Sequence, residues 1–235
     1  MKNVKNIFLL ASGHGLNDLI AGYFLGSYAS DNNDLLKIGL AITLYNILAF
    51  GGQYPVAILL EKLNGVKKII VLSYILNVIA LAIFLFTPVP AIILAGIASA
   101  IYHVAGGSYC AANNKALNIC VFAAPGVAGL ICGGFFAWKQ YNIIGIILPV
   151  AIAFLFILTQ LKFTKYPGEN KSGTGKHLSG IDQHDIIMIL LLIIISLRSV
   201  TWNVFQLIHE NNYEWLIAIA AVAVIGKIAG GRLHL

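Results

Sequence analysis

Long apolar segments alternate with short polar stretches along the whole chain. Eight such segments can be drawn, each near the length of about 20 residues that a helix needs to cross a bilayer. The stretches between the first six are short, so we expect consecutive helices to be antiparallel neighbours. The pattern therefore predicts an all-α, polytopic transmembrane helical bundle. The predicted spans are 7–30, 36–60, 68–87, 90–112, 117–138, 141–161, 185–208 and 213–230.

One polar stretch, 162–184, is much longer than the others. Its sequence, KFTKYPGENKSGTGKHLSGIDQH, is rich in Gly, Ser and Lys, which is the composition of a flexible linker. It divides the chain into a six-helix bundle over 1–162, a cytoplasmic linker over 163–184, and two helices over 185–235 that begin an incomplete second bundle.

The composition is that of a membrane protein. Hydrophobic residues make up 59% of the chain and charged residues 10%, whereas soluble domains average about 25% charged residues. The apolar segments are too long for the strands of a β-barrel, which have about 10 residues. The apolar run that ends at Ser12 is too short for a signal peptide and leads into polar residues, so we expect a first transmembrane span there.

The basic residues predict the orientation of the spans. When the eight spans are drawn, 12 of the 15 Lys and Arg residues lie on the side of the N-terminus, including Lys227 near the inner end of the last span. The positive-inside rule then places both termini and the linker in the cytoplasm, with the chain crossing the inner membrane several times. This topology also accounts for the net charge of +6, so we expect the lipid bilayer and no nucleic acid as a partner.

Three of the predicted spans carry ionisable side chains near their middle. A carboxylate at the bilayer centre costs about 2.5–3.5 kcal/mol on insertion scales, and such groups usually face a cavity and pair with one another. This cost favours a functional role for Asp18, and His14 shares its helix face because it lies four residues earlier. His103 and Arg198 lie at similar depth in two other spans. For His103, a functional role and a role only in packing both stay open.

This combination of side chains is typical of proton traffic. Histidine titrates near neutrality, and a cavity that holds histidines and a carboxylate can exchange protons as its exposure alternates between the two sides. We therefore predict proton coupling at Asp18, His14 and His103. The residues predicted to bind substrate or line the cavity are Asn17, Tyr23, Asn46 and Arg198.

The fifth predicted span contains the sequence APGVAGLICGG. Gly129 and Gly133 form a GxxxG pair, which lets another helix approach closely. Pro125, next to Gly126, can bend the helix. Static tight packing and a flexing gate helix are both open interpretations.

Enzyme chemistry and resident cofactors are not expected. P-loop, GxGxxG and HExxH motifs are absent. The three cysteines match no metal motif, so we interpret them as packing residues and predict no metal site. A haem bound by His14 and His103 stays as an alternative.

HGLND at His14–Asp18, GIASAIYH ending at His103, and the pair Arg198-Ser199 together resemble three helices of the major facilitator superfamily. The resemblance to the superfamily extends over nearly the whole chain, and within it the chain looks like the branch that includes fosmidomycin-resistance efflux proteins. Six spans, a long cytoplasmic loop and further spans are also the layout of that superfamily. The resemblance implies a small-molecule transporter that works by alternating access, with proton-coupled efflux.

The stretch EKLNGVKK resembles the signature loop between the second and third helices of the superfamily. This resemblance implies a cytoplasmic gate that holds the two halves together in one conformation. It is formed by Glu61, Lys62, Gly65 and Lys67. Glu61 stands where the family has aspartate. APGVAGLICGG is similar to the glycine–proline motif in the fifth helix of antiporters, with Ala128 in place of a glycine.

Two departures from the family pattern matter. Val104 and Ala105 follow His103 where the branch has proline and an acid, so His103 lacks a carboxylate partner on its own helix. The superfamily has twelve spans, so with eight we expect either a truncated transporter or one that a second chain or a second copy completes.

The expected function is proton-coupled efflux of small molecules. The alternatives are a non-transporting or degenerate membrane subunit that needs a partner chain, and the histidine-ligated haem protein.

Overall fold

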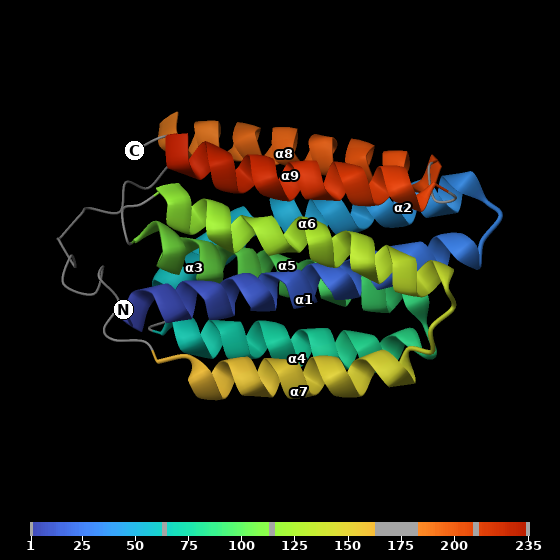
Figure 1. Cartoon of the computed structure of the whole chain (residues 1–235), viewed down its shortest axis with the longest axis horizontal. Coiled ribbons are helices and arrows are strands. Elements are labelled where there is room, and N and C mark those ends of the chain that lie inside the picture. Colours follow the sequence, from blue (N-terminus) through green and yellow to red (C-terminus); the bar gives the residue numbers. More distant parts are fainter. Residues whose placement is uncertain (1, 63–64, 113–115, 163–182, 209–211, 234–235) are drawn as a thin grey trace.

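The computed structural model describes residues 2–62, 65–112, 116–162, 183–208 and 212–233, and their regular secondary structure is helical. The helices lie roughly along one long axis and form an elongated bundle (Figure 1). Nearly all of the predicted linker lies outside the described residues. The elements are α1 (Lys2–Ser30), α2 (Leu35–Asn46), η1 (Ile47–Gly51), α3 (Gln53–Lys62), α4 (Val66–Phe84), α5 (Pro88–Ala111), α6 (Ala116–Trp138), α7 (Ile144–Gln160), α8 (Gln183–Ile208) and α9 (Tyr213–Leu233).

Each predicted apolar segment coincides with a helix, which confirms the all-α bundle. The second segment, 36–60, is one rod made of α2, the π-helix η1 and α3. Asp34 caps the start of this rod, because its carboxylate accepts hydrogen bonds from the backbone N–H groups of Leu36 and Lys37. The apolar pattern did not predict the π-helical turn. Such turns are frequent at functional sites.

Four helical segments among the described residues are long and apolar enough to cross a membrane. They are Leu35–Leu59, Val66–Phe84, Pro88–Ala111 and Ala116–Trp138. α1 has 29 residues and is long enough, but polar residues in its middle lower its hydropathy. α7 and the part of α8 from Ile189 to Trp202 are shorter apolar helices.

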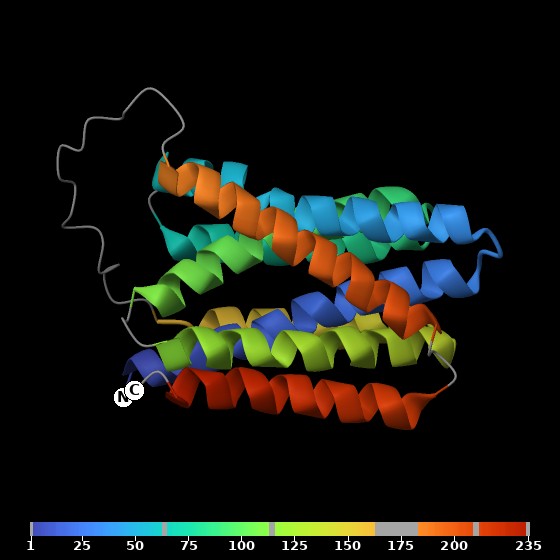
Figure 2. The ribbon, with the colours of Figure 1, turned by 90° about the horizontal axis from the view of Figure 1, so that it is seen from above.

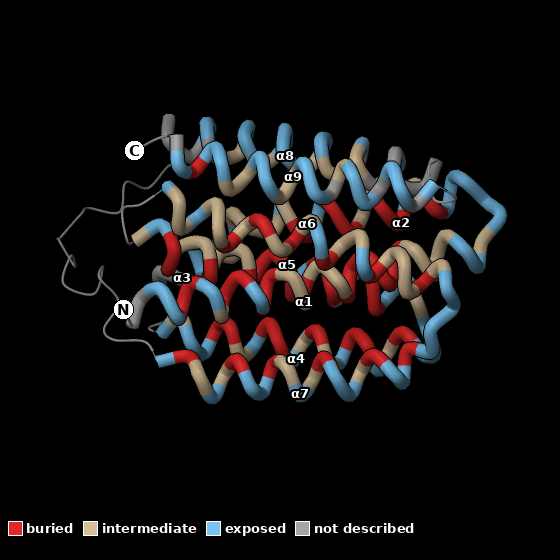
Figure 3. Tube along the Cα trace, in the orientation of Figure 1, coloured by how far each residue is buried: buried red, intermediate tan, exposed pale blue. Residues whose placement is uncertain are grey.

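The outward faces of the bundle are apolar. The exposed stretches of α7, α8 and α9 lie on the outside, while the buried stretches face inward (Figure 3). Leu148 and Leu155 on α7 are more than 60% exposed, and so is Leu197 on α8. Soluble monomers rarely expose large contiguous apolar patches, so these faces and the four apolar segments indicate a membrane protein.

α1 lies at the centre of the bundle and packs most extensively against α6. α4 packs on α5, α7 contacts α1 and α4, and α9 lies along α6. α8 crosses obliquely from the side of α2 and α3 toward the start of α9 (Figure 2). The expectation that consecutive helices are neighbours is therefore wrong in two places. α1 occupies the place beside α6 that was expected for α7, and α5 lies between α4 and the rod of α2, η1 and α3.

Glycines allow the close approach of α1 and α6. A Cβ atom on Gly129 would meet the backbone carbonyl of Gly15, and one on Gly133 would meet that of Leu19. From the opposite side, a Cβ atom on Gly22 would meet the carbonyl of Leu130. The structure thus places α1 against the predicted GxxxG pair, where small residues permit backbone contact.

Candidate functional site

α1, α5 and α6 bring polar groups together in the interior of the bundle. α1 supplies His14 and Asp18, which lie one turn apart, and α5 supplies His103. α6 packs against them with the backbone of Gly126. We call His14, Asp18 and His103 the central cluster. These are the three residues to which the sequence analysis assigned proton coupling.

The polar atoms of the central cluster are in direct contact. Nε2 of His14 lies 2.8 Å from Nε2 of His103 and 3.3 Å from Oδ2 of Asp18. The His14 side chain is buried, whereas 18% of the Asp18 side chain is exposed. The cluster is therefore interior, but one of its members is still accessible.

Backbone carbonyls hold the outer nitrogens of both imidazoles. Nδ1 of His14 lies 2.8 Å from the carbonyl oxygen of Phe122 on α6, and Nδ1 of His103 lies 2.8 Å from that of Ser99, one turn earlier on α5. A carbonyl oxygen only accepts hydrogen bonds, so each Nδ1 carries the proton and donates it. The two Nε2 atoms of the neutral rings therefore bear lone pairs.

Amide side chains orient the carboxylate of Asp18. Asn17 donates one hydrogen bond from Nδ2 to Oδ1 of Asp18 at 3.1 Å and another to the hydroxyl of Ser99, also at 3.1 Å. Asn77 on α4 donates in turn to Oδ1 of Asn17 at 2.9 Å. The hydroxyl of Tyr45 donates to Ser99 as well. Oδ2 of Asp18 thus remains directed toward His14.

A cation from α9 lies close to the cluster. The ammonium group of Lys227 donates a hydrogen bond to the carbonyl oxygen of Ala123 on α6, at 3.2 Å. It interacts electrostatically with Asp18 and His103. The sequence analysis had counted Lys227 among the cytoplasmic charges. Its position within an otherwise apolar helix is the signal that could have identified it.

The residues predicted to line the cavity are dispersed, apart from Asn17. Arg198 is exposed on α8, and its described electrostatic interaction is with Lys227. Tyr23 donates to the carbonyl of Tyr141, before α7. Asn46 is fully buried, but its amide donates to the carbonyl of Ile42 in its own helix.

The predicted cytoplasmic gate is described only in part. The side chains of Glu61 and Lys62 lie outside the described residues. Gly65 has a positive φ of 125° just before α4, a conformation that favours glycine. Lys67 donates to the carbonyl of Leu161 at 3.4 Å, which links the start of α4 to the end of α7.

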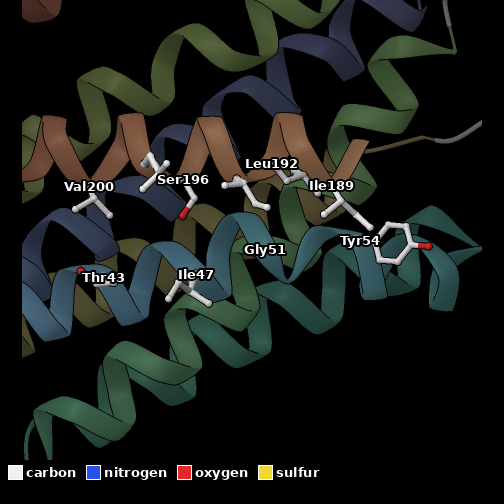
Figure 4. Close-up of a pocket in the computed structure, with 10 residues that line it drawn as sticks. Thr43, Ile47, Gly51, Tyr54, Ile189, Leu192, Ser196 and Val200 are labelled. Atoms are coloured by element: carbon white, nitrogen blue, oxygen red, sulfur yellow. The ribbon is translucent and has the colours of Figure 1, made fainter. Parts of the chain in front are cut away.

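An apolar cavity of about 430 Å³ lies apart from the central cluster, between α8 and the rod of α2, η1 and α3 (Figure 4). The side chains in Figure 4 come from both sides of this interface. The π-helical turn forms part of its wall. It is lined by Thr43, Ile47, Gly51, Tyr54, Ile189, Leu192, Ile193, Ser196, Leu197 and Val200.

No protein-family model, curated protein or solved structure matches this chain. The resemblance to the major facilitator superfamily therefore stays a prediction.

Proposed function

We propose that this chain is a polytopic membrane transporter of major-facilitator type that exports small molecules in exchange for protons. The observation that carries the proposal is the central cluster, an ionisable group of three side chains inside a bundle of apolar helices. Such groups are costly in a membrane and usually mark an ion or substrate pathway. The motif resemblances at His14–Asp18 and His103 support the same function.

The geometry of the cluster favours the binding of one positive charge. The lone pairs of two neutral imidazoles meet at 2.8 Å, and the carboxylate of Asp18 adds a negative charge at 3.3 Å from one of them. Without a cation these atoms repel one another. One proton held between them removes the repulsion, which makes the cluster a suitable coupling site.

The proposed topology has eight spans, with both ends of the chain in the cytoplasm of a cell with an inner membrane. α1 begins and α9 ends at the same end of the bundle (Figure 1), as an even number of spans requires. In this proposal α8 and α9 supply part of the second wall of the pathway.

Haem binding is less well supported by the same geometry. A planar macrocycle cannot lie between two ligand nitrogens that are 2.8 Å apart. A small cation fits the arrangement better.

The proposal is tested with the purified chain in liposomes that contain a pH-sensitive dye. After a pH gradient is imposed, pools of uncharged, anionic and cationic small molecules are added one at a time. We expect at least one pool to cause proton movement above that in protein-free liposomes. If no pool does so while the inserted protein is verified as folded, the proposed function is wrong.

A further inference from the structure

The central cluster has the donor set of a metal site. One ligand atom each from His14, Asp18 and His103 can be chosen so that all three lie within 4.8 Å of one another. Imidazole nitrogen together with carboxylate oxygen suits Zn²⁺ and its neighbours in the first transition row, whereas Mg²⁺ and Ca²⁺ prefer oxygen alone. Three protein ligands with an open fourth position are typical of zinc sites that exchange a bound molecule.

Each of these three side chains also makes a hydrogen bond through an atom other than its ligand atom. The carbonyl oxygen of Phe122 accepts from Nδ1 of His14, and that of Ser99 accepts from Nδ1 of His103. The Asp18 carboxylate is held at Oδ1 by Asn17, while its Oδ2 faces Nε2 of His14. Hydrogen bonds of this kind orient metal-binding histidines and carboxylates. They hold both Nε2 atoms and Oδ2 close to one another.

The mutual arrangement of the two imidazoles is also compatible with a metal ion. Their planes are 85° apart and their centroids only 4.4 Å apart. If the two Nε2 lone pairs pointed straight at each other, the ring centroids would be further apart than this. The two lone pairs therefore do not lie along one line. A hydrogen bond prefers a straight line, whereas metal ligands meet at an angle.

Two of the three ligand spacings can be compared with those of a tetrahedral site, and the third, between Asp18 and His103, is within 4.8 Å. With zinc–ligand distances of 2.0–2.1 Å, two ligand atoms stand roughly 3.4 Å apart. Oδ2 of Asp18 and Nε2 of His14 are 3.3 Å apart. The two Nε2 atoms, at 2.8 Å, reach this spacing by a small rotation of either ring.

Gly126 keeps the space beside Oδ2 of Asp18 and Nε2 of His14 free of side-chain atoms. A Cβ atom on Gly126 would meet Oδ2 of Asp18 and would lie 2.8 Å from Nε2 of His14. A methyl group there would occupy the space that lies against both ligand atoms. Glycine at this position on α6 is therefore explained by a need for room beside the cluster.

We propose that His14, Asp18 and His103 bind one divalent transition-metal ion of the Zn²⁺ type, with the open side of the site against Gly126. No metal site was predicted from the sequence, because the cysteines match no metal motif; the two histidines lie 89 positions apart, and no short motif links them. The ammonium group of Lys227 opposes binding, but the carbonyl of Ala123 holds it. Binding is measured on purified protein, so this inference does not rest on the proposed transport.

The test uses the full chain without a polyhistidine tag. The four other histidines are changed to glutamine, which leaves His14 and His103 as the only histidines. This background protein is titrated with Co²⁺, whose visible absorption reports tetrahedral nitrogen and oxygen ligation, and then with Zn²⁺ in competition. The four changed positions are His177, His184, His209 and His234.

We expect one equivalent of Co²⁺ to bind to the background protein and to be displaced by Zn²⁺. Asp18→Asn should weaken binding by at least about tenfold. Gly126→Ala should weaken it as much, although it keeps all three ligands. Gly134→Ala on the same helix is the control, because a Cβ atom there has no neighbour within 4 Å, and should bind normally.

Circular dichroism and size-exclusion chromatography confirm that each variant is folded before it is titrated. The absence of stoichiometric Co²⁺ binding by the background protein would overturn the proposal. Equal affinity of the background protein and of Gly126→Ala would overturn it as well, because the metal would then lie elsewhere.

Discussion

Asp18→Asn is expected to abolish proton-driven transport and to leave membrane insertion intact. Asparagine has nearly the same shape and can still accept the hydrogen bond that Asn17 donates. It removes the negative charge that lies 3.3 Å from Nε2 of His14, so the two imidazoles lose the group that compensates a proton between them. We expect proton movement to fall to the level of protein-free liposomes.

The measurement is dye-reported proton movement with the pool of molecules that the unaltered protein transports. Asp31→Asn is the matched control, because Asp31 is exposed just after the end of α1 and should be dispensable. Insertion is checked by flotation of the proteoliposomes. It should not suffer, because the substitution removes a carboxylate that costs about 2.5–3.5 kcal/mol at the bilayer centre. Transport at the unaltered rate by Asp18→Asn would refute proton coupling at this residue.

Gly133→Ala is expected to destabilise the bundle, although alanine is the better helix former. The new Cβ atom would meet the backbone carbonyl of Leu19 and lie 2.7 Å from the backbone nitrogen of Tyr23. Because both neighbours are backbone atoms, α1 and α6 have to move apart. Overpacking of this kind typically costs about 1–3 kcal/mol, and we expect the upper end of that range.

Gly134→Ala is the control for this prediction. It lies one position further along α6, and its Cβ atom would have no neighbour within 4 Å. Alanine there should stabilise the helix by up to about 1 kcal/mol. Thermal unfolding of the two variants in detergent gives the comparison. Equal midpoints would show that α1 and α6 do not pack as closely as described.

The sequence indicated how deep a residue lies along the bundle, but it did not indicate in which direction the side chain points. The positions of His14, Asp18 and His103 within their apolar segments placed them at one level, and the helices do bring them together. Arg198 has similar depth in the sequence, yet it is exposed on α8. The direction in which a side chain points depends on how the helices pack, and the apolar pattern of α8 does not determine that.

Two backbone groups of the site had no signal in the sequence. The carbonyl oxygens of Phe122 and Ala123 bind side chains of α1 and α9, and a backbone carbonyl is present at every residue. Ser99 was missed as well, although it lies one turn before His103 and its hydroxyl accepts from two side chains. The four-residue spacing between Ser99 and His103 was the available clue.

The contact between the imidazoles of His14 and His103 supports both proposals, and solid-state NMR measures it most directly. The protein, with its four other histidines replaced, is labelled with ¹⁵N in the imidazole rings and placed in bilayers. We predict protons on both Nδ1 atoms and dipolar coupling between the two Nε2 atoms that corresponds to their separation of 2.8 Å. Nε2 atoms too distant to couple, or rings protonated at Nε2 and bare at Nδ1, would contradict the shared cation site.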